Sequence, residues 1–504
     1  MHHSPWHHAR VPPVSIGPLR ALGLGSLSAV LLCAAFPPFE LVPISWVALV
    51  PLLFAVVRVE STANEVLLAG GAFGFALFAF ELRWFYAIFG APAVVFWAVL
   101  AFFLARTLWL AWRIGQRWGE RALVLAIPVL WTGVEHLRSE CWPLAFGWIT
   151  PGYAQASDSR AVQAAEIFGV YGLTFVVVLA SSLSAWGTAR AGAPRLARGL
   201  AVLAVPVAYS VLAAYGAHRS TALEAEMVGE PRVRVAAIQY ETNSLEDGLA
   251  LLDRVPEGTQ LVVFPELGAV YRDHQLTYVE AFEGELRARA LTRGAVLVVG
   301  AERRAPGGNP VLDFYNTLAI IAPHGPALHY TKAEPVPLFA DGVASDDVHA
   351  YDTELGRLGF AICYDFTHPH VVDALRGARA FVVASGDLAS WSELQHRQHA
   401  LVTRLRAVEH RRWFVRATSS GYSQIVDPNG RVHGELGFED VGMLTGEIGL
   451  RETTTLYDAV GLWPARLCLA AWLIAAAMEL GRALRERTPA LRPSPGDPRV
   501  RTRA

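Results

Sequence analysis

The feature that most constrains this chain is a series of long apolar runs separated by short connections. These runs cover residues 19–35, 41–57, 65–82, 91–112, 122–136, 166–187, 197–215 and 459–478. A helix needs about 20 apolar residues to cross a bilayer, and several runs reach that length. Charged residues make up only 17% of the chain, against roughly 25% in soluble domains. The pattern predicts a multi-span helical membrane domain, with seven or eight spans and eight favoured.

Arginine is distributed unevenly among the connections between these runs. With the N-terminus inside, the inner connections and the final tail carry Arg58, Arg106, Arg113, Arg117, Arg121, Arg190, Arg195, Arg198, Arg482, Arg485, Arg487, Arg492, Arg499, Arg501 and Arg503. The outer connections carry only Arg83, Arg138 and Arg160. Positively charged residues concentrate on the cytoplasmic side of a membrane. An eight-span chain therefore has the long segment 216–458 outside.

The segment 216–458 has a different character from the rest of the chain. Short β-rich runs such as "RVRVAAIQY", "AVLVVGAE" and "WFVRATS" alternate with helix-like stretches at 276–293 and 390–411. Continuous apolar strands that alternate with helices indicate an α/β layered domain whose sheet is buried on both faces. We therefore expect an N-terminal transmembrane domain of about seven spans, an α/β domain, a last transmembrane helix and an arginine-rich cytoplasmic tail, over residues 1–215, 216–458, 459–480 and 481–504.

Several classes of function are disfavoured. The net charge of −2 offers no basic field for nucleic acid. No GxGxxG follows a strand and no GxxxxGK[ST] occurs, so a nucleotide site is not supported. The four cysteines show no zinc-ligand spacing, and "MHHSPWHH" is better explained as a cytoplasmic tail than as a metal site. We expect no cofactor and no metal.

Three strands of the α/β segment end in a reactive residue. "LVVFPE" ends at Glu266, "ALHYTK" at Lys332 and "GFAIC" at Cys363. Reactive groups gather where strand ends meet loops in α/β sheets. A Cys363 thiolate can attack a carbonyl carbon and hold an acyl group as a thioester, and Glu266 can move the proton. A buried structural role is the ordinary alternative for each residue taken singly, but their joint occurrence favours chemistry.

Lys332 is the only lysine among 43 lysine and arginine residues. An ammonium is compact and carries three rotatable donors at one point, whereas a guanidinium is broad and planar. A cramped site for a tetrahedral oxyanion could therefore accept lysine and exclude arginine. This difference offers a physical reason for one lysine in an arginine-rich chain.

The trio "FPE", "YTK" and "ICYD" resembles the Glu-Lys-Cys set of the carbon–nitrogen hydrolase, or nitrilase, superfamily. Spans before and after such a domain, with "FGWITPGYAQAS", "GVYGLTF" and "DAVGLWP", resemble the apolipoprotein N-acyltransferases. The resemblance implies a nitrilase-like αββα sandwich outside the membrane. It also implies transfer of an acyl chain from a phospholipid, through a Cys363 thioester, to the α-amine of a diacylglyceryl-cysteine at a lipoprotein N-terminus. The expected location is a bacterial inner membrane, with the catalytic domain on the periplasmic side.

The loops around the trio depart from the family pattern. Where the family usually has "VPFGE" after the lysine, this chain reads "VPLFADG", with Ala340 in place of a second glutamate and Asp341 one residue later. Asp365 replaces a glutamate two residues past the cysteine. "SGDLASW" replaces the segment after the next strand, which displaces Asp387 and Trp391. We interpret Asp341 as a substitute for the missing carboxylate.

Further residues are candidates for substrate binding or support. Tyr364 follows the nucleophile, and the family resemblance makes Trp148 and Tyr153 candidates for lining a lipid entrance. His368 and His370 in "THPHVVD" are interpreted as part of a polar loop. We expect a monomer whose partners are a phospholipid donor, a diacylated lipoprotein and the membrane, without nucleic acid. Two alternatives remain open: a related amidase or acyltransferase with another amine acceptor, and a catalytically silent relative that binds lipid or lipoprotein.

Overall fold

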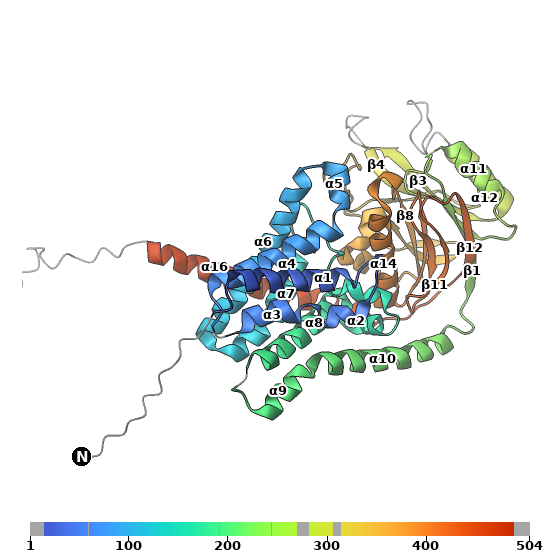
Figure 1. Ribbon diagram of the computed structural model, residues 1–504. Coiled ribbons are helices and arrows are strands. Elements are labelled where there is room, and N and C mark those ends of the chain that lie inside the picture. The colour runs from blue at the N-terminus through green and yellow to red at the C-terminus, as the bar shows by residue number, and fades with distance from the viewer. Residues whose placement is uncertain are drawn as a thin grey trace, which may run out of the picture.

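A helical region and a two-sheet domain make up this chain (Figure 1). The computed structural model describes residues 15–58, 60–190, 192–242, 244–269, 282–305 and 314–487. The expected stretch 276–293 therefore lies partly outside the described residues. The whole N-terminal histidine run and most of the arginine-rich tail also lie outside them. Everything below concerns the described residues.

All eight apolar runs form helices. The elements are α1 (Pro18–Cys33), α2 (Val42–Ala48), α3 (Val50–Val57), α4 (Ala63–Glu81), α5 (Trp84–Phe89), α6 (Pro92–Trp118), α7 (Glu120–Glu140), α8 (Ala165–Ala189), α9 (Arg195–Val202), α10 (Ala204–Glu226) and α16 (Trp463–Arg487). Four described segments are long and apolar enough to cross a membrane, namely Ala63–Glu81, Pro92–Trp118, Ala161–Ala189 and Trp463–Glu486. The bent pair α9 and α10 makes a fifth if it is counted as one span. The remaining apolar helices are shorter or less apolar.

Helix α10 continues past the expected domain boundary at residue 215 and ends at Glu226. The stretch "GAHRSTALEAE" is too polar to extend an apolar run, but its alanine, leucine and glutamate residues are good helix formers. The end of α10 reaches the α/β domain, where the Glu226 carboxylate pairs with Arg451 at 2.9 Å. One continuous helix therefore links the two parts of the chain.

Two six-stranded sheets form the α/β domain. The first has the order β12-β1-β2-β3-β4-β5 and the second β11-β10-β9-β8-β7-β6. Their bounds are β1 (Arg232–Gln239), β2 (Leu261–Val263), β3 (Val296–Arg304), β4 (Phe314–Ile321), β5 (Leu328–Thr331), β6 (Tyr351–Thr353), β7 (Gly356–Ile362), β8 (Ala380–Ser385), β9 (Trp413–Thr418), β10 (Ser423–Val426), β11 (Val432–Leu436) and β12 (Gly442–Gly449). The central strands of each sheet run parallel and the outer ones antiparallel.

The two sheets pack face to face, with helices on their outer faces. Alternate residues such as Val263, Val298 and Val382 point between the sheets and form one apolar core. Helices α11 (Leu245–Asp253) and α12 (Glu283–Arg293) cover the first sheet. Helix α14 (Glu393–His410) lies between the second sheet and the helical region (Figure 1). This helix–sheet–sheet–helix arrangement confirms the expected layered sandwich.

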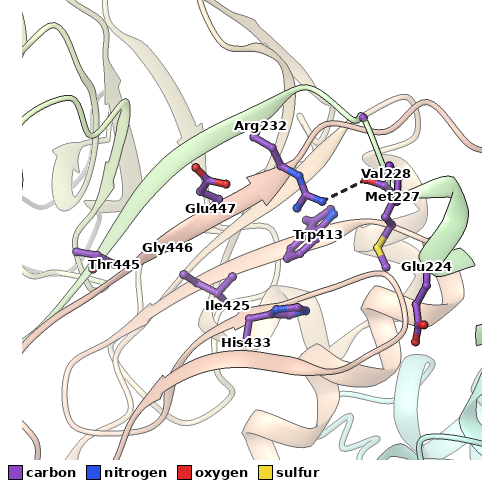
Figure 2. A pocket seen from close by; sticks show the side chains of 11 residues that line it. Glu224, Met227, Val228, Arg232, Trp413, Ile425, His433, Thr445, Gly446 and Glu447 are labelled. Carbon is purple, nitrogen blue, oxygen red and sulfur yellow. Dashed lines mark hydrogen bonds between the residues drawn. The ribbon is translucent and has the colours of Figure 1, made fainter.

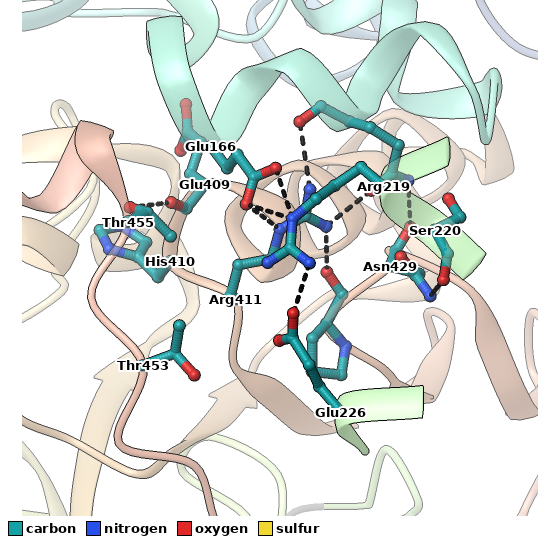
Figure 3. A network of polar contacts seen from close by, with 12 residues as sticks. Glu166, Arg219, Ser220, Glu226, Glu409, His410, Arg411, Asn429, Thr453 and Thr455 are labelled. Atoms are coloured by element: carbon teal, nitrogen blue, oxygen red, sulfur yellow. Dashed lines mark hydrogen bonds and ion pairs between the residues drawn. The ribbon is translucent and has the colours of Figure 1, made fainter. Parts of the chain in front are cut away.

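A buried ionic network joins the helical region to the second sheet (Figure 3). Arg411, just after α14, is fully buried and donates to Glu166 Oε2 at 2.8 Å and to Gln163 Oε1 at 2.6 Å. Arg219 on α10 donates to the same Glu166 carboxylate at 2.9 Å. Buried charges need partners of this kind, because an isolated charge out of water is very costly. The two parts of the molecule are therefore held in one relative position.

Candidate active site

Glu266 and Lys332 follow two separate strands of the first sheet, β2 and β5, and their side chains meet directly. The Lys332 ammonium lies 2.7 Å from Glu266 Oε1 and 2.6 Å from Asp341 Oδ2. The lysine side chain is 1% exposed, so both contacts are shielded from water. Because an ammonium carries three donors, one N–H remains beyond those two carboxylates. The segment "VPLFAD", which departs from the family pattern, thus provides a second carboxylate, that of Asp341, in contact with Lys332.

Asn316, which was not predicted from the sequence, connects the carboxylates of Glu266 and Asp341. Its amide Nδ2 donates to Glu266 Oε1 at 2.7 Å and to Asp341 Oδ1 at 2.9 Å. The signal was a buried amide within the apolar strand "FYNTLAII", since a polar side chain there needs a partner. On the other side, the backbone N–H of Gly386 donates to Glu266 Oε2 at 2.6 Å. A Cβ at residue 386 would lie 2.8 Å from that oxygen, so glycine permits the approach.

Cys363 stands at the end of β7, where the backbone leaves the strand. Its φ is +48°, a left-handed conformation that is unusual for a residue other than glycine. Such strained positions cluster at functional sites. Cys363 is buried, so desolvation raises the pKa of its thiol, and the Glu266 charge raises it further while Lys332 opposes the shift. The thiol therefore needs a nearby base to become a nucleophile.

The electrostatics of the trio agree with a proton-accepting carboxylate. Burial raises the pKa of Glu266, Lys332 lowers it, and the negative charge of Asp341 raises it again, with a net upward shift. The pKa of Lys332 is also raised, because the attraction of Glu266 and Asp341 exceeds the effect of burial. Lys332 is consequently charged, and Glu266 is a stronger base than a solvated glutamate.

Asp365 braces the loop that carries the lysine. Its carboxylate accepts hydrogen bonds from Tyr330 Oη at 2.7 Å and from the backbone N–H groups of Ala333 and Glu334 at 3.1 and 2.7 Å. Burial raises the pKa of Asp365 to about 6. Asp365 thereby holds the segment after Lys332 against the segment after Cys363, and so fixes the relative position of these two residues.

An apolar cavity of about 650 Å³ opens onto Cys363. Its described lining includes Tyr364 and Trp148, with α5, α6 and the loop after α7 supplying Trp84, Phe85, Phe89, Val95, Phe96, Val99, Trp142 and Phe146. Phe339 and Trp391 also line it, with ring centroids 5.4 Å apart. The aromatic runs "RWFYAIFG" and "CWPLAFGW" were the available signals for this wall. The cavity therefore continues from the membrane-type helices to the thiol.

Tyr153, a predicted residue of the lipid entrance, lies beside the cavity instead of in it, and so does Asp387 from the segment "SGDLASW". Tyr153 is not among the described lining residues, and its hydroxyl donates to the Thr367 carbonyl at 3.2 Å and accepts from Arg406. Asp387 is buried and pairs with Arg416 at 2.5 Å and with His399 at 2.8 Å. Although burial opposes ionisation, these partners hold the pKa of Asp387 below its usual range. Both residues support the walls of the site.

A second cavity of about 510 Å³ lies at the junction of α10 and β1 (Figure 2). The Arg232 guanidinium stacks over the Trp413 ring at 4.8 Å and donates to the Met227 carbonyl at 3.2 Å. Glu266, Lys332 and Cys363 are not among its described lining residues. The chemistry therefore centres on the first cavity.

Comparisons with known proteins agree with this division of the chain. A model of the apolipoprotein N-acyltransferase N-terminal domain matches residues 28–183, and a carbon–nitrogen hydrolase model matches residues 234–457. An apolipoprotein N-acyltransferase of Geobacter metallireducens is 27% identical over 95% of this chain and 98% of its own length. One from Pseudomonas syringae pv. tomato is 26% identical, over 90% and 95%. A nitrilase-superfamily structure from Saccharomyces cerevisiae aligns with 47% of this chain and 97% of its own, at a TM-score of 0.38 and 22% identity.

The fold and the site define a membrane protein with a carbon–nitrogen hydrolase domain. The two matched domains together span most of the chain, and the relatives extend over nearly its whole length. This chain belongs to the apolipoprotein N-acyltransferase family. It is an enzyme of the acyltransferase type, as the sequence predicted.

Proposed function

We propose that this protein transfers an acyl chain from a membrane phospholipid to the α-amine of the diacylglyceryl-cysteine at a lipoprotein N-terminus. The observation that carries the proposal is the apolar cavity of about 650 Å³ that ends at Cys363. An acyl chain is an apolar ligand, and such ligands bind in clefts lined by apolar and aromatic side chains. The substrate of a hydrolase of small soluble amides would not need a large apolar cavity lined by α5 and α6.

In the first half-reaction, Glu266 takes the proton of the Cys363 thiol, and the thiolate attacks the ester carbonyl carbon of the phospholipid. The free N–H of Lys332 donates to the oxyanion of the tetrahedral intermediate. The ester C–O bond then breaks, and Glu266 returns the proton to the departing oxygen. The products are lysophospholipid and a Cys363 thioester. Asn316 and Asp341 keep Glu266 and Lys332 in position through both proton transfers.

In the second half-reaction, the α-amine of the lipoprotein attacks the thioester carbonyl carbon. Glu266 takes a proton from the amine, and Lys332 again stabilises the oxyanion. The C–S bond breaks, the thiolate recovers the proton from Glu266, and an amide is released. An ester and an amine have become an alcohol and an amide, and the enzyme is unchanged. The same two groups serve both steps because each step passes through the same kind of oxyanion.

We also propose eight spans, with the α/β domain beginning after α10 and the other domain boundaries as expected from the sequence. We place the segment from the end of α10 to residue 458 on the periplasmic side of a bacterial inner membrane. The arginine distribution supports this orientation. Cys141 is the exposed cysteine among the four and follows α7 in an outer connection. A membrane-impermeant maleimide should label Cys141 in intact spheroplasts, and Cys141→Ser should abolish the labelling. Labelling only after lysis would contradict the orientation.

Mass spectrometry of the intact, purified protein tests the chemistry. Incubation with phospholipid should yield a hydroxylamine-labile acyl adduct that is absent from Cys363→Ala and retained in the matched variant Cys141→Ala. The absence of an adduct under reducing conditions would overturn the acyl-transfer mechanism. A diacylated lipopeptide should then discharge the adduct. An adduct indifferent to the lipopeptide would point to a different amine acceptor.

A further inference from the structure

A cluster of two histidines and two glutamates lies where the helical region meets the catalytic domain, and the proposed acyl transfer does not use it. Glu140 comes from the end of α7, and His368 and His370 follow the nucleophile strand β7. Glu334 belongs to the loop after Lys332. Donor atoms of Glu140, His368 and His370 all lie within 4.8 Å of one another. Segments distant in the sequence therefore converge here on one small volume.

His368 is the observation that points to a ligand. Its side chain is only 4% exposed, and neither ring nitrogen has a hydrogen-bond partner among the described residues. A buried polar group without a partner costs about 1–3 kcal/mol, so such groups call for an explanation. The Nδ1 atom of His368 lies 3.9 Å from Glu140 Oε2, which is too far for a hydrogen bond. A bound ion between these two atoms would give His368 Nδ1 the partner that it lacks, whereas Glu140 Oε2 already lies 2.7 Å from His370 Nδ1.

The spacing of the donors fits zinc. Ligands about 2.0–2.1 Å from a tetrahedral zinc ion lie about 3.3 Å from one another. The His370 Nδ1–Glu140 Oε2 and His368 Nδ1–Glu140 Oε2 separations are 2.7 and 3.9 Å, on either side of that value. Imidazole nitrogens also favour zinc over magnesium and calcium, which take oxygen ligands.

The surrounding contacts resemble those that orient metal ligands. His370 Nε2 lies 3.0 Å from Glu334 Oε1, so a ring that binds metal through Nδ1 can donate its other N–H to a carboxylate. Glu140 Oε1 accepts from Tyr171 Oη at 3.1 Å, which leaves Oε2 facing the histidines. We propose that Glu140, His368 and His370 bind one zinc ion, with Glu334 and Tyr171 as orienting residues. The ion would clamp the end of α7 to the loops that follow Cys363 and Lys332.

Zinc binding to the full-length protein in detergent tests this proposal without any readout of acyl transfer. Because the histidines of "MHHSPWHH" could bind metal themselves, the background carries His2, His3, His7 and His8 replaced by serine. After chelator treatment, reloading with zinc chloride and desalting, elemental analysis should find one zinc per chain. His368→Ala and Glu140→Gln should lose it, and the exposed control His324→Ala should keep it.

Competition with a chromophoric zinc chelator supplies the second measurement. Glu334→Gln should weaken zinc binding by about 10–100-fold, the usual effect of removing an orienting partner, in a protein whose circular dichroism and elution volume are unchanged. Cys363→Ala should bind zinc like its parent, which separates this site from the Cys363, Asp387 and His399 group. Zinc content below one per chain in the background protein, or zinc lost from Cys363→Ala and kept in His368→Ala, would overturn the proposal.

Discussion

The substitution Lys332→Arg separates the charge of this buried side chain from its shape, and so tests the role that we propose for it. The Lys332 side chain is 1% exposed, and its nitrogen contacts Glu266 and Asp341 at 2.7 and 2.6 Å. An ammonium satisfies two carboxylates and an oxyanion from one point. A guanidinium spreads its donors over a rigid plane, so it cannot occupy that point without moving a carboxylate or losing the oxyanion contact.

The expected loss follows from one missing oxyanion donor. Removing such a donor costs about 10²–10³-fold in rate, or about 2.7–4 kcal/mol, and we expect this loss in the rate of Cys363 acylation. Overpacking of the site adds about 1–3 kcal/mol of destabilisation. Lys332→Met is the matched variant, because it removes the charge and leaves two buried carboxylates without it. Breaking a buried pair in this way costs about 3–5 kcal/mol of stability.

The assay is the initial rate of adduct formation on Cys363, followed by intact-protein mass spectrometry at saturating phospholipid. Thermal unfolding in the same detergent accompanies it. The thermal unfolding midpoint of Lys332→Arg should lie closer to that of the parent protein than the midpoint of Lys332→Met does. Acylation of Cys363 in Lys332→Arg should nevertheless be far slower than in the parent protein. If Lys332→Arg acylates at the parental rate, the positive charge is sufficient and the argument from compact shape is refuted.

Three further predictions concern the base, the cavity and the domain contact. Burial and the charge of Asp341 raise the pKa of Glu266, so Glu266 loses its base form at a higher pH than a solvated glutamate does. Asp341→Asn removes this charge and should move the acid limb of the acylation rate, plotted against pH, to lower pH. An acid limb that does not move would contradict this coupling. Val99→Trp narrows the cavity and should reduce adduct formation from long-chain phospholipids more than from short-chain ones in parallel mass-spectrometric assays. Arg411→Ala should cost about 3–5 kcal/mol and lower the thermal unfolding midpoint, whereas the exposed Arg431→Ala should cost under about 1 kcal/mol.

The sequence predicted the layered sandwich and the helical structure of the eight apolar runs because both depend on local patterns. Hydrophobic period and run length are properties of neighbouring residues, and strand ends carry Glu266, Lys332 and Cys363 wherever the strands lie. The contacts that complete the site are of another kind. Asn316 reaches Glu266 across 50 positions, and the Gly386 N–H reaches it across 120. No local pattern encodes such pairs, so only the packed sheets reveal them.

The contacts of His368 and His370 also depend on residues that are distant in the sequence. The sequence "THPHVVD" predicts a polar loop, and the local context of its two histidines contains no ligand spacing. Glu140 lies 230 positions from His370, and only the docking of α7 against the catalytic domain brings the two within 2.7 Å. The loop around Asp341, which departs from the family pattern, lines the apolar cavity with residues 336–339. The cluster of Glu140, His368 and His370 joins the end of α7 to the loop that follows Cys363. Both features therefore lie at the contact between the membrane helices and the catalytic domain, where the cavity that we propose for the acyl chain opens onto Cys363.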